Sequence, residues 1–351
     1  MVILGLGTAA PAHRYAQREC WEILRGSRHF QELNPRAQAI CRKVLCSQNG
    51  VATRHLALED LTQAFDLSPD TLRARFLEHA PKLAAEAAAS ALTQAHTQAN
   101  EIDALLISTC TGYSCPGLTS YVSERLGLGR QVLSLDLVGQ GCGAALPNLR
   151  TAEALLSSGR CRRALSICVE VCSAAFYLDN DPGVLISACL FGDGAGAAVL
   201  ANEGNSERRV EWKFGGSLLN PEARGRLCFE QRHGMLRNVL APEVPDLAAE
   251  HAARVLEEML ARAGISRREV QGWILHPGGR DVLRALQKRL GLSEADVRWS
   301  AAVLKEYGNV SSASVYFVMQ AALADTVPPG YWWMGSFGAG FSAHGALWKV
   351  N

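Results

Sequence analysis

Residues 135–149 read Leu-Asp-Leu-Val-Gly-Gln-Gly-Cys-Gly-Ala-Ala-Leu-Pro-Asn-Leu, and they place a cysteine between glycines where an apolar segment gives way to helical spacing. Residues 131–138 alternate as a strand does, whereas residues 146–156 repeat apolar side chains at helical spacing. Pro147 limits where the helix can begin, because proline is well tolerated only in the first turn. The pattern predicts a strand, a tight turn at Cys142 and the start of a helix.

A cysteine at this position is a candidate nucleophile. The unpaired amides and the positive dipole end of a helix favour an anion, so we expect the pKa of the Cys142 thiol to be lowered and its thiolate to be populated. The two flanking glycines are expected to leave space for a thioester beside the sulfur. The alternative is a buried structural cysteine, since free cysteines are among the most buried residues and the chain has eleven.

The composition bounds the class of protein. The chain has 351 residues, enough for two domains or two fused halves, and its net charge of +1 gives no reason to expect nucleic acid or an anionic membrane as the main partner. The odd number of cysteines and the lack of zinc-type spacing argue against a disulfide framework or a structural metal. The apolar residues 1–7 reach His13 and Arg14 too soon for a signal peptide or a membrane span. We expect a cytoplasmic protein.

Predicted strands and helices alternate along the chain in two halves of similar order. The polar run 202–209 is the candidate boundary, which gives an N-terminal half of residues 1–205 and a C-terminal half of 206–351. The glycine-rich run 192–196 is not a dinucleotide-binding loop, because residues 197–200 predict a strand where that motif needs a helix. The sequence therefore predicts an internally duplicated, layered α/β fold. The other expected elements are strands at 1–7, 102–109, 164–171, 211–219, 272–276 and 346–350, helices at 16–24, 34–45, 71–100, 247–263, 281–290 and 311–324, and an irregular segment at 227–239.

Two further residues occupy positions like that of Cys142, at the end of a predicted strand or the start of a helix. They are His276 and Asn309. Each has a structural explanation, since histidines at strand ends are often satisfied core residues and asparagine is a common N-cap. Together the three fit a cysteine activated by histidine, with asparagine as an orienting or donating group. The same order fits papain-like peptidases, so the three residues alone leave the reaction open.

The sequences around these residues resemble the active-site motifs of type III polyketide synthases, the chalcone synthase superfamily. The motifs are Gly-Gln-Gly-Cys-Gly at 139–143, Trp-Ile-Leu-His-Pro-Gly-Gly at 273–279 and Glu-Tyr-Gly-Asn-Val-Ser-Ser at 306–312. Leu-Phe-Gly-Asp-Gly at 190–194 and Phe-Gly-Ala-Gly at 337–340 are similar to two more. This resemblance implies a thiolase-type five-layered αβαβα fold and a homodimer. Papain-like enzymes have a different cysteine neighbourhood.

The resemblance also implies a reaction. Cys142, paired with His276, would take an acyl group from an acyl-CoA starter. Malonyl-CoA would then lose carbon dioxide, and His276 Nε2 with the Asn309 amide would stabilise the enolate without a metal or a separate cofactor. The enolate would attack the acyl thioester, and repeated extension would end in cyclisation to a pyrone, a resorcinol or another polyphenol.

Further residues match substrate-binding positions of the family. Phe191 matches an aromatic gatekeeper between the coenzyme A tunnel and the cavity. Lys43, and less directly Arg54, match the region where basic residues bind coenzyme A phosphates, and Gly278 and Gly279 would let the pantetheine arm pass close to the backbone. The expected cavity-lining residues are Cys110, Cys115, Ala175 and Ser311.

Three of these residues bear on the starter. Plant chalcone synthases carry threonine and methionine where this chain has Cys110 and Cys115, which argues against chalcone formation. Small side chains at Cys110 and Ala175 favour a fatty acyl starter. The alternatives are a single-condensation ketoacyl synthase of the KAS III kind, against which Gly-Gln-Gly-Cys and His-Pro-Gly-Gly argue, and a thiolase-fold protein that binds acyl-CoA without condensing it.

Overall fold

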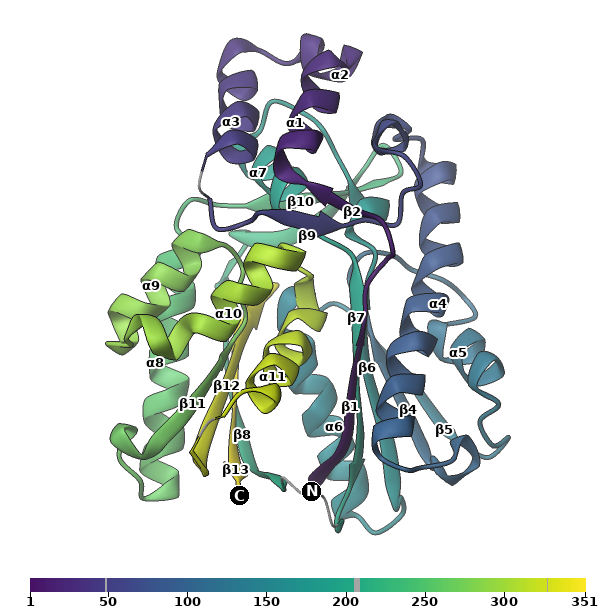
Figure 1. Ribbon diagram of the computed structural model, residues 1–351, viewed down its shortest axis with the longest axis vertical. Helices are drawn as coiled ribbons and strands as arrows, with labels where there is room; N and C mark the ends of the chain where they lie inside the picture. Colours follow the sequence, from purple (N-terminus) through teal and green to yellow (C-terminus); the bar gives the residue numbers. More distant parts are fainter. Residues whose placement is uncertain (48, 205–208, 327) are drawn as a thin grey trace.

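A nine-stranded mixed sheet runs through the molecule in the order β11-β12-β13-β8-β1-β7-β6-β4-β5 (Figure 1). The computed structural model describes residues 1–47, 49–204, 209–326 and 328–351. Five strands come from the first half of the chain and four from the second. The strands are β1 (Val2–Ala9), β4 (Ala104–Ser108), β5 (Leu133–Leu137), β6 (Arg163–Glu170), β7 (Gly194–Ala201), β8 (Val210–Arg224), β11 (Val270–Leu275), β12 (Gly330–Gly338) and β13 (Gly340–Val350).

The two halves of the sheet meet at a short ladder between β1 and β8. Val2 pairs with Glu211 and Ile3 with Val210, and both pairs are antiparallel. On one side of this ladder β4 runs parallel to β5 and β6, and on the other β11 runs parallel to β12. The structure therefore joins the predicted halves through one continuous sheet, while the predicted boundary between residues 205 and 206 lies outside the described residues.

Helices form layers on and between the two halves of the sheet. The central layer holds α6 (Ala145–Ser157) and α11 (Ser314–Ala324), each of which contacts strands of both halves. The helices α4 (Pro69–Gln94) and α8 (Val244–Ala263) cover the two outer faces. Reading across, the order is helix, sheet, helix, sheet, helix, which is the predicted five-layered arrangement (Figure 1). Further helices are α5 (Leu118–Leu126), α9 (Arg280–Leu290) and α10 (Glu294–Tyr307).

The alanine-rich helix α4 packs on β1 at backbone contact distance. A Cβ added to Gly7 would lie 2.2 Å from the carbonyl oxygen of Ala87, and one added to Gly5 would lie 2.2 Å from that of Ala91. Because no side chain fits between the helix and the strand, glycine on one and alanine on the other allow this approach. The helix was expected to reach residue 100, but it ends at Gln94, and His96 has a positive φ of 48°.

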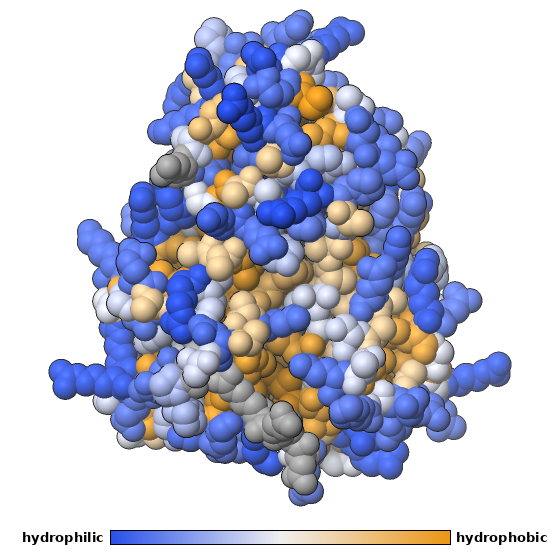
Figure 2. Space-filling view, in the orientation of Figure 1, coloured by the Kyte–Doolittle hydropathy of each residue, from blue (hydrophilic) through white to orange (hydrophobic). Residues whose placement is uncertain are grey.

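The second half of the sheet is built around large aromatic side chains. Trp332, Trp333 and Trp348 are fully buried, and Trp332 stacks on Trp299 of α10 with ring centroids 6.0 Å apart. Burial of such side chains contributes strongly to stability because each removes a large apolar area from water. On the face drawn in Figure 2, hydrophobic residues gather toward the lower middle, whereas the rim is mostly hydrophilic.

Smaller elements form the upper part of the molecule in Figure 1. A β-hairpin replaces the irregular segment expected at 227–239, and its turn is made by His233 and Gly234, both with positive φ. The sequence pattern missed this hairpin because its strands carry charged side chains, so no apolar alternation marks them. The elements are β2 (Arg14–Ala16), α1 (Gln17–Gly26), α2 (Arg28–Glu32), α3 (Pro35–Cys46), β3 (Thr53–His55), α7 (Pro182–Leu190), β9 (Leu227–Arg232) and β10 (Met235–Leu240).

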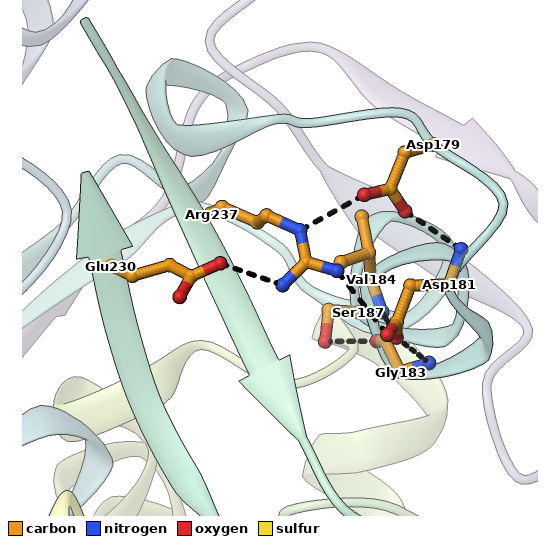
Figure 3. Close-up of polar contacts among 7 residues, drawn as sticks. All are labelled: Asp179, Asp181, Gly183, Val184, Ser187, Glu230 and Arg237. Atoms are coloured by element: carbon orange, nitrogen blue, oxygen red, sulfur yellow. Dashed lines mark hydrogen bonds and ion pairs between the residues drawn. The ribbon is translucent and has the colours of Figure 1, made fainter. Parts of the chain in front are cut away.

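Arg237 on β10 ties this hairpin to the loop before α7 (Figure 3). Its guanidinium, only 10% exposed, donates to Asp179 Oδ2 and to Glu230 Oε1, both at 2.9 Å, and lies 3.2 Å from Asp181 Oδ2. Contacts with three carboxylates fix the position of the guanidinium, because charge-assisted hydrogen bonds are directional. We call these four residues the Arg237 clasp.

In the described residues, no helix combines the length and apolar character needed to cross a membrane.

Candidate active site

Cys142 lies in a single 3-10 turn, Gly141–Gly143, between β5 and α6. Gly141 has a φ of +55°, and a Cβ on it would lie 2.9 Å from the backbone nitrogen of Ala339. A Cβ on Gly143 would lie 3.0 Å from the ring of His344. The glycines are therefore required by the close approach of the β12–β13 connection. These contacts by themselves account for the two glycines, and the expected space for a thioester beside the sulfur stays a prediction.

A chain of hydrogen bonds joins the three predicted catalytic residues. Ser311 Oγ donates to Cys142 Sγ at 3.3 Å, and the Ser311 backbone amide donates to Asn309 Oδ1 at 2.9 Å. Asn309 Nδ2 donates to the Gly278 carbonyl at 3.1 Å, and the Gly278 amide donates to the His276 carbonyl at 3.1 Å. The connections between β5 and α6, between β11 and α9 and between α10 and α11 therefore meet at one place.

Burial keeps both the thiol and the imidazole neutral. The pKa of Cys142 is raised to about 12 by desolvation, partly offset by the hydrogen bond from Ser311. Burial likewise lowers the pKa of His276 to about 3. The expected lowering of the Cys142 pKa is therefore wrong, because desolvation outweighs the hydrogen bonds that favour the thiolate.

The imidazole of His276 is available for chemistry. Both ring nitrogens are buried, and neither has a hydrogen-bond partner among the described residues. In particular, neither nitrogen is hydrogen-bonded to Cys142. The ring packs edge-on against Phe337, with centroids 5.0 Å apart. Its backbone amide donates to the Gly335 carbonyl at 2.9 Å, which fixes it at the end of β11. A buried, unpartnered histidine is costly to stability, and such a group is typical of a site that completes its hydrogen bonds with substrate.

Glu170 is the functional residue that the sequence pattern missed. It is fully buried at the end of β6, and it accepts hydrogen bonds from the Cys110 amide at 3.0 Å, the Thr111 hydroxyl at 3.0 Å and the Ser312 hydroxyl. Cys110 Sγ and Ser311 Oγ each lie 3.3 Å from its Oε1. The available signal was a single carboxylate ending an otherwise apolar strand, because a buried charge needs partners.

The pKa of the Glu170 carboxyl is raised by burial, and the hydrogen bonds from Ser312, Cys110 and Thr111 oppose the shift. Since Glu170 contacts Ser311, which in turn contacts Cys142, it orients the side chains around the sulfur. Cys110 is part of the same cluster, with its Sγ 3.3 Å from Ser311 Oγ.

Phe191 lies directly beside Asn309. The two residues form an isolated bridge, in which the Gly192 amide donates to the Asn309 carbonyl at 3.0 Å and the Asn309 amide to the Leu190 carbonyl at 2.9 Å. The end of α7 and the segment that carries Asn309 therefore hold each other in place.

Arg54 supports this junction from inside. It is 4% exposed, and its guanidinium donates to the carbonyls of Ala188 at 2.8 Å and Phe191 at 3.0 Å and to Gln17 Oε1 at 3.0 Å. Nε and Nη1 of Arg54 are therefore used inside the protein, where they hold the backbone of the proposed gatekeeper, and the predicted contact of Arg54 with coenzyme A phosphates stays a prediction.

Two cavities adjoin the cluster. The inner cavity, about 20 Å³, brings together Phe191, Ala175 and Ser311 as predicted. The outer cavity, about 560 Å³, is lined by Cys110 and Gly141 at one end and extends between α4 and the β9–β10 hairpin. Thr111 and Phe229 line both. The outer cavity is of the size that holds small organic ligands in proteins.

The remaining predicted residues lie at the surface or the rim. Cys115 is exposed and lines neither cavity, so its assignment as a cavity residue is not supported in this chain. Lys43 is exposed in the last turn of α3. A Cβ on Gly279 would meet only Leu190, at 3.6 Å, whereas one on Gly278 would lie 3.0 Å from Phe337. Gly279 therefore borders free space, whereas Gly278 is packed against the ring of Phe337, which also contacts His276.

No group of three or more His, Cys, Asp or Glu side chains is arranged to hold a metal ion in the part of the chain that the structure describes.

Comparison with known proteins gives consistent matches over the whole chain. Two family models match, described as chalcone and stilbene synthases, N-terminal domain (residues 1–204) and C-terminal domain (residues 219–328). A 3,5-dihydroxyphenylacetyl-CoA synthase of Streptomyces toyocaensis is 29% identical over 98% of this chain and 89% of its own length.

Solved structures show the same fold. PKS-I of the brown alga Ectocarpus siliculosus has a TM-score of 0.89 and 27% identity over 100% of this chain and 98% of its own. The 1,3,6,8-tetrahydroxynaphthalene synthase of Streptomyces coelicolor A3(2), a bacterial type III polyketide synthase, has a TM-score of 0.91 and 24% identity over 99% of both chains.

Proposed function

This chain belongs to the chalcone and stilbene synthase family, the type III polyketide synthases, and on that premise we propose that Cys142, His276 and Asn309 carry out its condensation chemistry. It is a condensing acyltransferase that uses coenzyme A thioesters. The observation that carries the assignment of roles is the hydrogen-bond chain from Cys142 through Ser311 and Asn309 to Gly278, beside a histidine with two free ring nitrogens.

In the loading step Cys142 Sγ attacks the carbonyl of an acyl-CoA starter. The thiol proton passes to the neutral imidazole of His276, and the coenzyme A thiolate leaves and takes a proton. The low pKa of His276 and the high pKa of Cys142 keep the resting pair neutral, so charge develops only when substrate is present. Substrate binding then supplies the transition-state interactions that make the transfer favourable.

In the extension step the carboxylate of malonyl-CoA leaves as carbon dioxide, and its electron pair forms an enolate. The enolate oxygen needs fixed donors, which His276 and the Asn309 amide supply. The enolate carbon attacks the acyl thioester of Cys142 and releases the sulfur. No step of this reaction needs an external oxidant or reductant, so the reaction requires no redox cofactor.

The cavities set the range of starters and products. The outer cavity of about 560 Å³ is lined by Cys110, and Ala175 contributes only a small side chain to the lining of the inner cavity. We therefore favour an acyl starter as large as a fatty acyl group, with cyclisation to a pyrone, a resorcinol or another polyphenol. Coenzyme A would enter beside Gly279, with Lys43 available to its phosphates.

A homodimer is proposed through β5. This strand pairs with β4 on one side only, and the adjoining apolar residues Leu133 and Val138 are 43% and 57% exposed. An open edge strand with exposed apolar side chains favours pairing with a second copy. Leu133→Lys with Val138→Lys should give monomers in light scattering, whereas Ile23→Lys, at an exposed position on α1, should leave dimers.

The cytoplasm is the expected location. All eleven cysteines are free, including the buried neighbours of Cys142, and free thiols are typical of a reducing compartment.

Incubation with malonyl-CoA and a panel of acyl-CoAs, followed by mass spectrometry, tests the function. We expect products of several condensations released without a carrier protein. Cys142→Ala should abolish the acyl-enzyme, whereas His276→Ala and Asn309→Ala should keep acylation and lose most condensation. A single ketoacyl product made only on a carrier protein, or acylation of Cys142→Ala, would overturn the assignment.

A further inference from the structure

Arg73 lies at the solvent end of the outer cavity, in the second turn of α4. It is exposed, as is Tyr113, which is 75% exposed and lines the same opening. The lining residues Thr109 and Thr111 are buried at the other end, beside Cys110. The cavity therefore leads from the catalytic cluster toward Arg73.

Arg73 is the one charged side chain among the lining residues of this cavity in the described part of the chain. Within the described residues, no carboxylate oxygen lies within 4.0 Å of its guanidinium, so no ion pair neutralises it there. Gln231 and Tyr113 add neutral polar groups at the same end. Guanidinium binds carboxylate in a two-pronged geometry and is weakly hydrated, so it suits a carboxylate at a partly desolvated opening.

The walls between the two ends are mainly apolar. Leu72 and Phe76 of α4 line the cavity together with Phe229 and Leu236 of the hairpin. The hairpin turn closes on the start of α4, where a Cβ on Gly234 would lie 3.1 Å from Pro69. The cavity thus offers an apolar path that ends at a single positive charge.

Chain growth determines which part of a substrate meets Arg73. After each condensation the extended chain is a coenzyme A thioester, and Cys142 Sγ must take it back with release of the coenzyme A thiol. Two more carbons then separate the starter from the sulfur, so the far end of the starter moves outward along the cavity. We propose that Arg73 selects starters with a second carboxylate at that far end, the mono-coenzyme A thioesters of dicarboxylic acids. This specificity rests on the proposed function, and it narrows the starter class within acyl chains that the apolar walls accept.

The test compares suberyl-CoA with octanoyl-CoA, which have equal chain length and differ in the terminal carboxylate. Condensation with malonyl-CoA is followed by mass spectrometry to give kcat/KM. The wild type should prefer suberyl-CoA, and Arg73→Gln should lower kcat/KM for it about fivefold while leaving octanoyl-CoA unchanged, as for a partly exposed ion pair. Arg73→Lys should retain part of the preference. Lys82→Gln, an exposed cation on the same helix, is the control and should match the wild type.

A charge reversal provides the second arm. Arg73→Glu should disfavour suberyl-CoA and favour 8-aminooctanoyl-CoA over octanoyl-CoA. Adipyl-CoA and sebacyl-CoA, each with its monocarboxylic counterpart, extend the comparison to shorter and longer chains. Equal activity of Arg73→Gln and wild type on every diacid, or an equal loss on diacid and monoacid, would overturn the selectivity. Failure of any acyl-CoA to acylate Cys142 would instead contradict the proposed function.

Discussion

Individual residues show most clearly what a sequence can reveal. Cys142, His276 and Asn309 could be predicted as one site because each stands at the junction of a strand and a helix within a specific motif, and the structure brings the three together. Glu170 could not, because its role depends on donors from distant segments such as Ser312. Arg54 was matched to the region that binds coenzyme A phosphates, and only the fold shows that Nε and Nη1 of its guanidinium donate to groups inside the protein.

Ser311 gives a prediction at this scale, because its hydroxyl lowers the pKa of Cys142. Ser311→Ala should raise that pKa further and slow iodoacetamide alkylation of Cys142 about tenfold at pH 8, the value of one hydrogen bond to a charged group. Alkylation should quicken with rising pH in both proteins, because the thiolate fraction increases. The rate is measured by mass mapping of the peptide that contains Cys142.

The control is Ser314→Ala, which removes a buried hydroxyl without a hydrogen-bond partner among the described residues. In this variant Cys142 should be alkylated at the wild-type rate. Equal rates in the wild type and Ser311→Ala would contradict the hydrogen bond as the cause.

At the scale of elements, amphipathic segments were predictable and charged ones were not. The helix expected at 34–45 is α3, whereas the hairpin β9–β10 was taken for an irregular segment. Its position depends on the Arg237 clasp, in which Arg237 contacts Asp179, 58 positions earlier in the chain. Contacts of this kind become visible only when the chain is folded.

The clasp predicts how the hairpin is held. Arg237→Ala should lower the free energy of unfolding by about 1–3 kcal/mol, because three carboxylates lose their shared cation and one partner is removed from a partly buried network. Amide hydrogen exchange in β9 and β10 should quicken, since local opening costs less. Denaturant unfolding and exchange measured by mass spectrometry check both.

Arg232→Ala serves as the matched variant, because Arg232 is exposed at the end of β9. It should change stability by less than about 0.5 kcal/mol. If the amides of β9 and β10 exchange at the same rate in Arg237→Ala and Arg232→Ala, the clasp does not hold the hairpin.

At the scale of the whole molecule, the layered arrangement was implied by the family motifs and is present. The continuity of the sheet was not predictable, because two pairs between β1 and β8 leave no pattern in the sequence. Likewise, nothing in the spacing of apolar residues shows that α6 and α11 each contact both halves, since periodicity reports the width of a buried face and not its partner.

Buried histidines predict an acid dependence of overall stability. Burial lowers the pKa of His276 to about 3, and the unfolded chain binds that proton near pH 6.5, so the free energy of unfolding should fall as the pH falls between these values. His344, with a pKa of about 4 caused by burial and then by Arg150, acts in the same direction. In the wild type, His276 should account for about 2 kcal/mol of the decrease in the free energy of unfolding between pH 6 and pH 4, and His276→Gln should abolish that part of the decrease.

Urea unfolding at several pH values measures this slope. His13→Gln, at an exposed position, should keep the wild-type slope. An unchanged slope in His276→Gln would show that the buried imidazole is not the group that titrates.

The placement of β1 has a consequence for synthesis on the ribosome. This strand precedes every other described element, yet it lies in the interior of the sheet between β7 and β8, whose residues follow about 190 positions later. Because a strand cannot form its ladder before its neighbours exist, the apolar segment Val2–Ala9 must wait unpaired while more than half of the chain is made. The nascent chain therefore carries an exposed aggregation-prone strand through most of translation, and yield in cells should depend on chaperones that bind the emerging N-terminal segment.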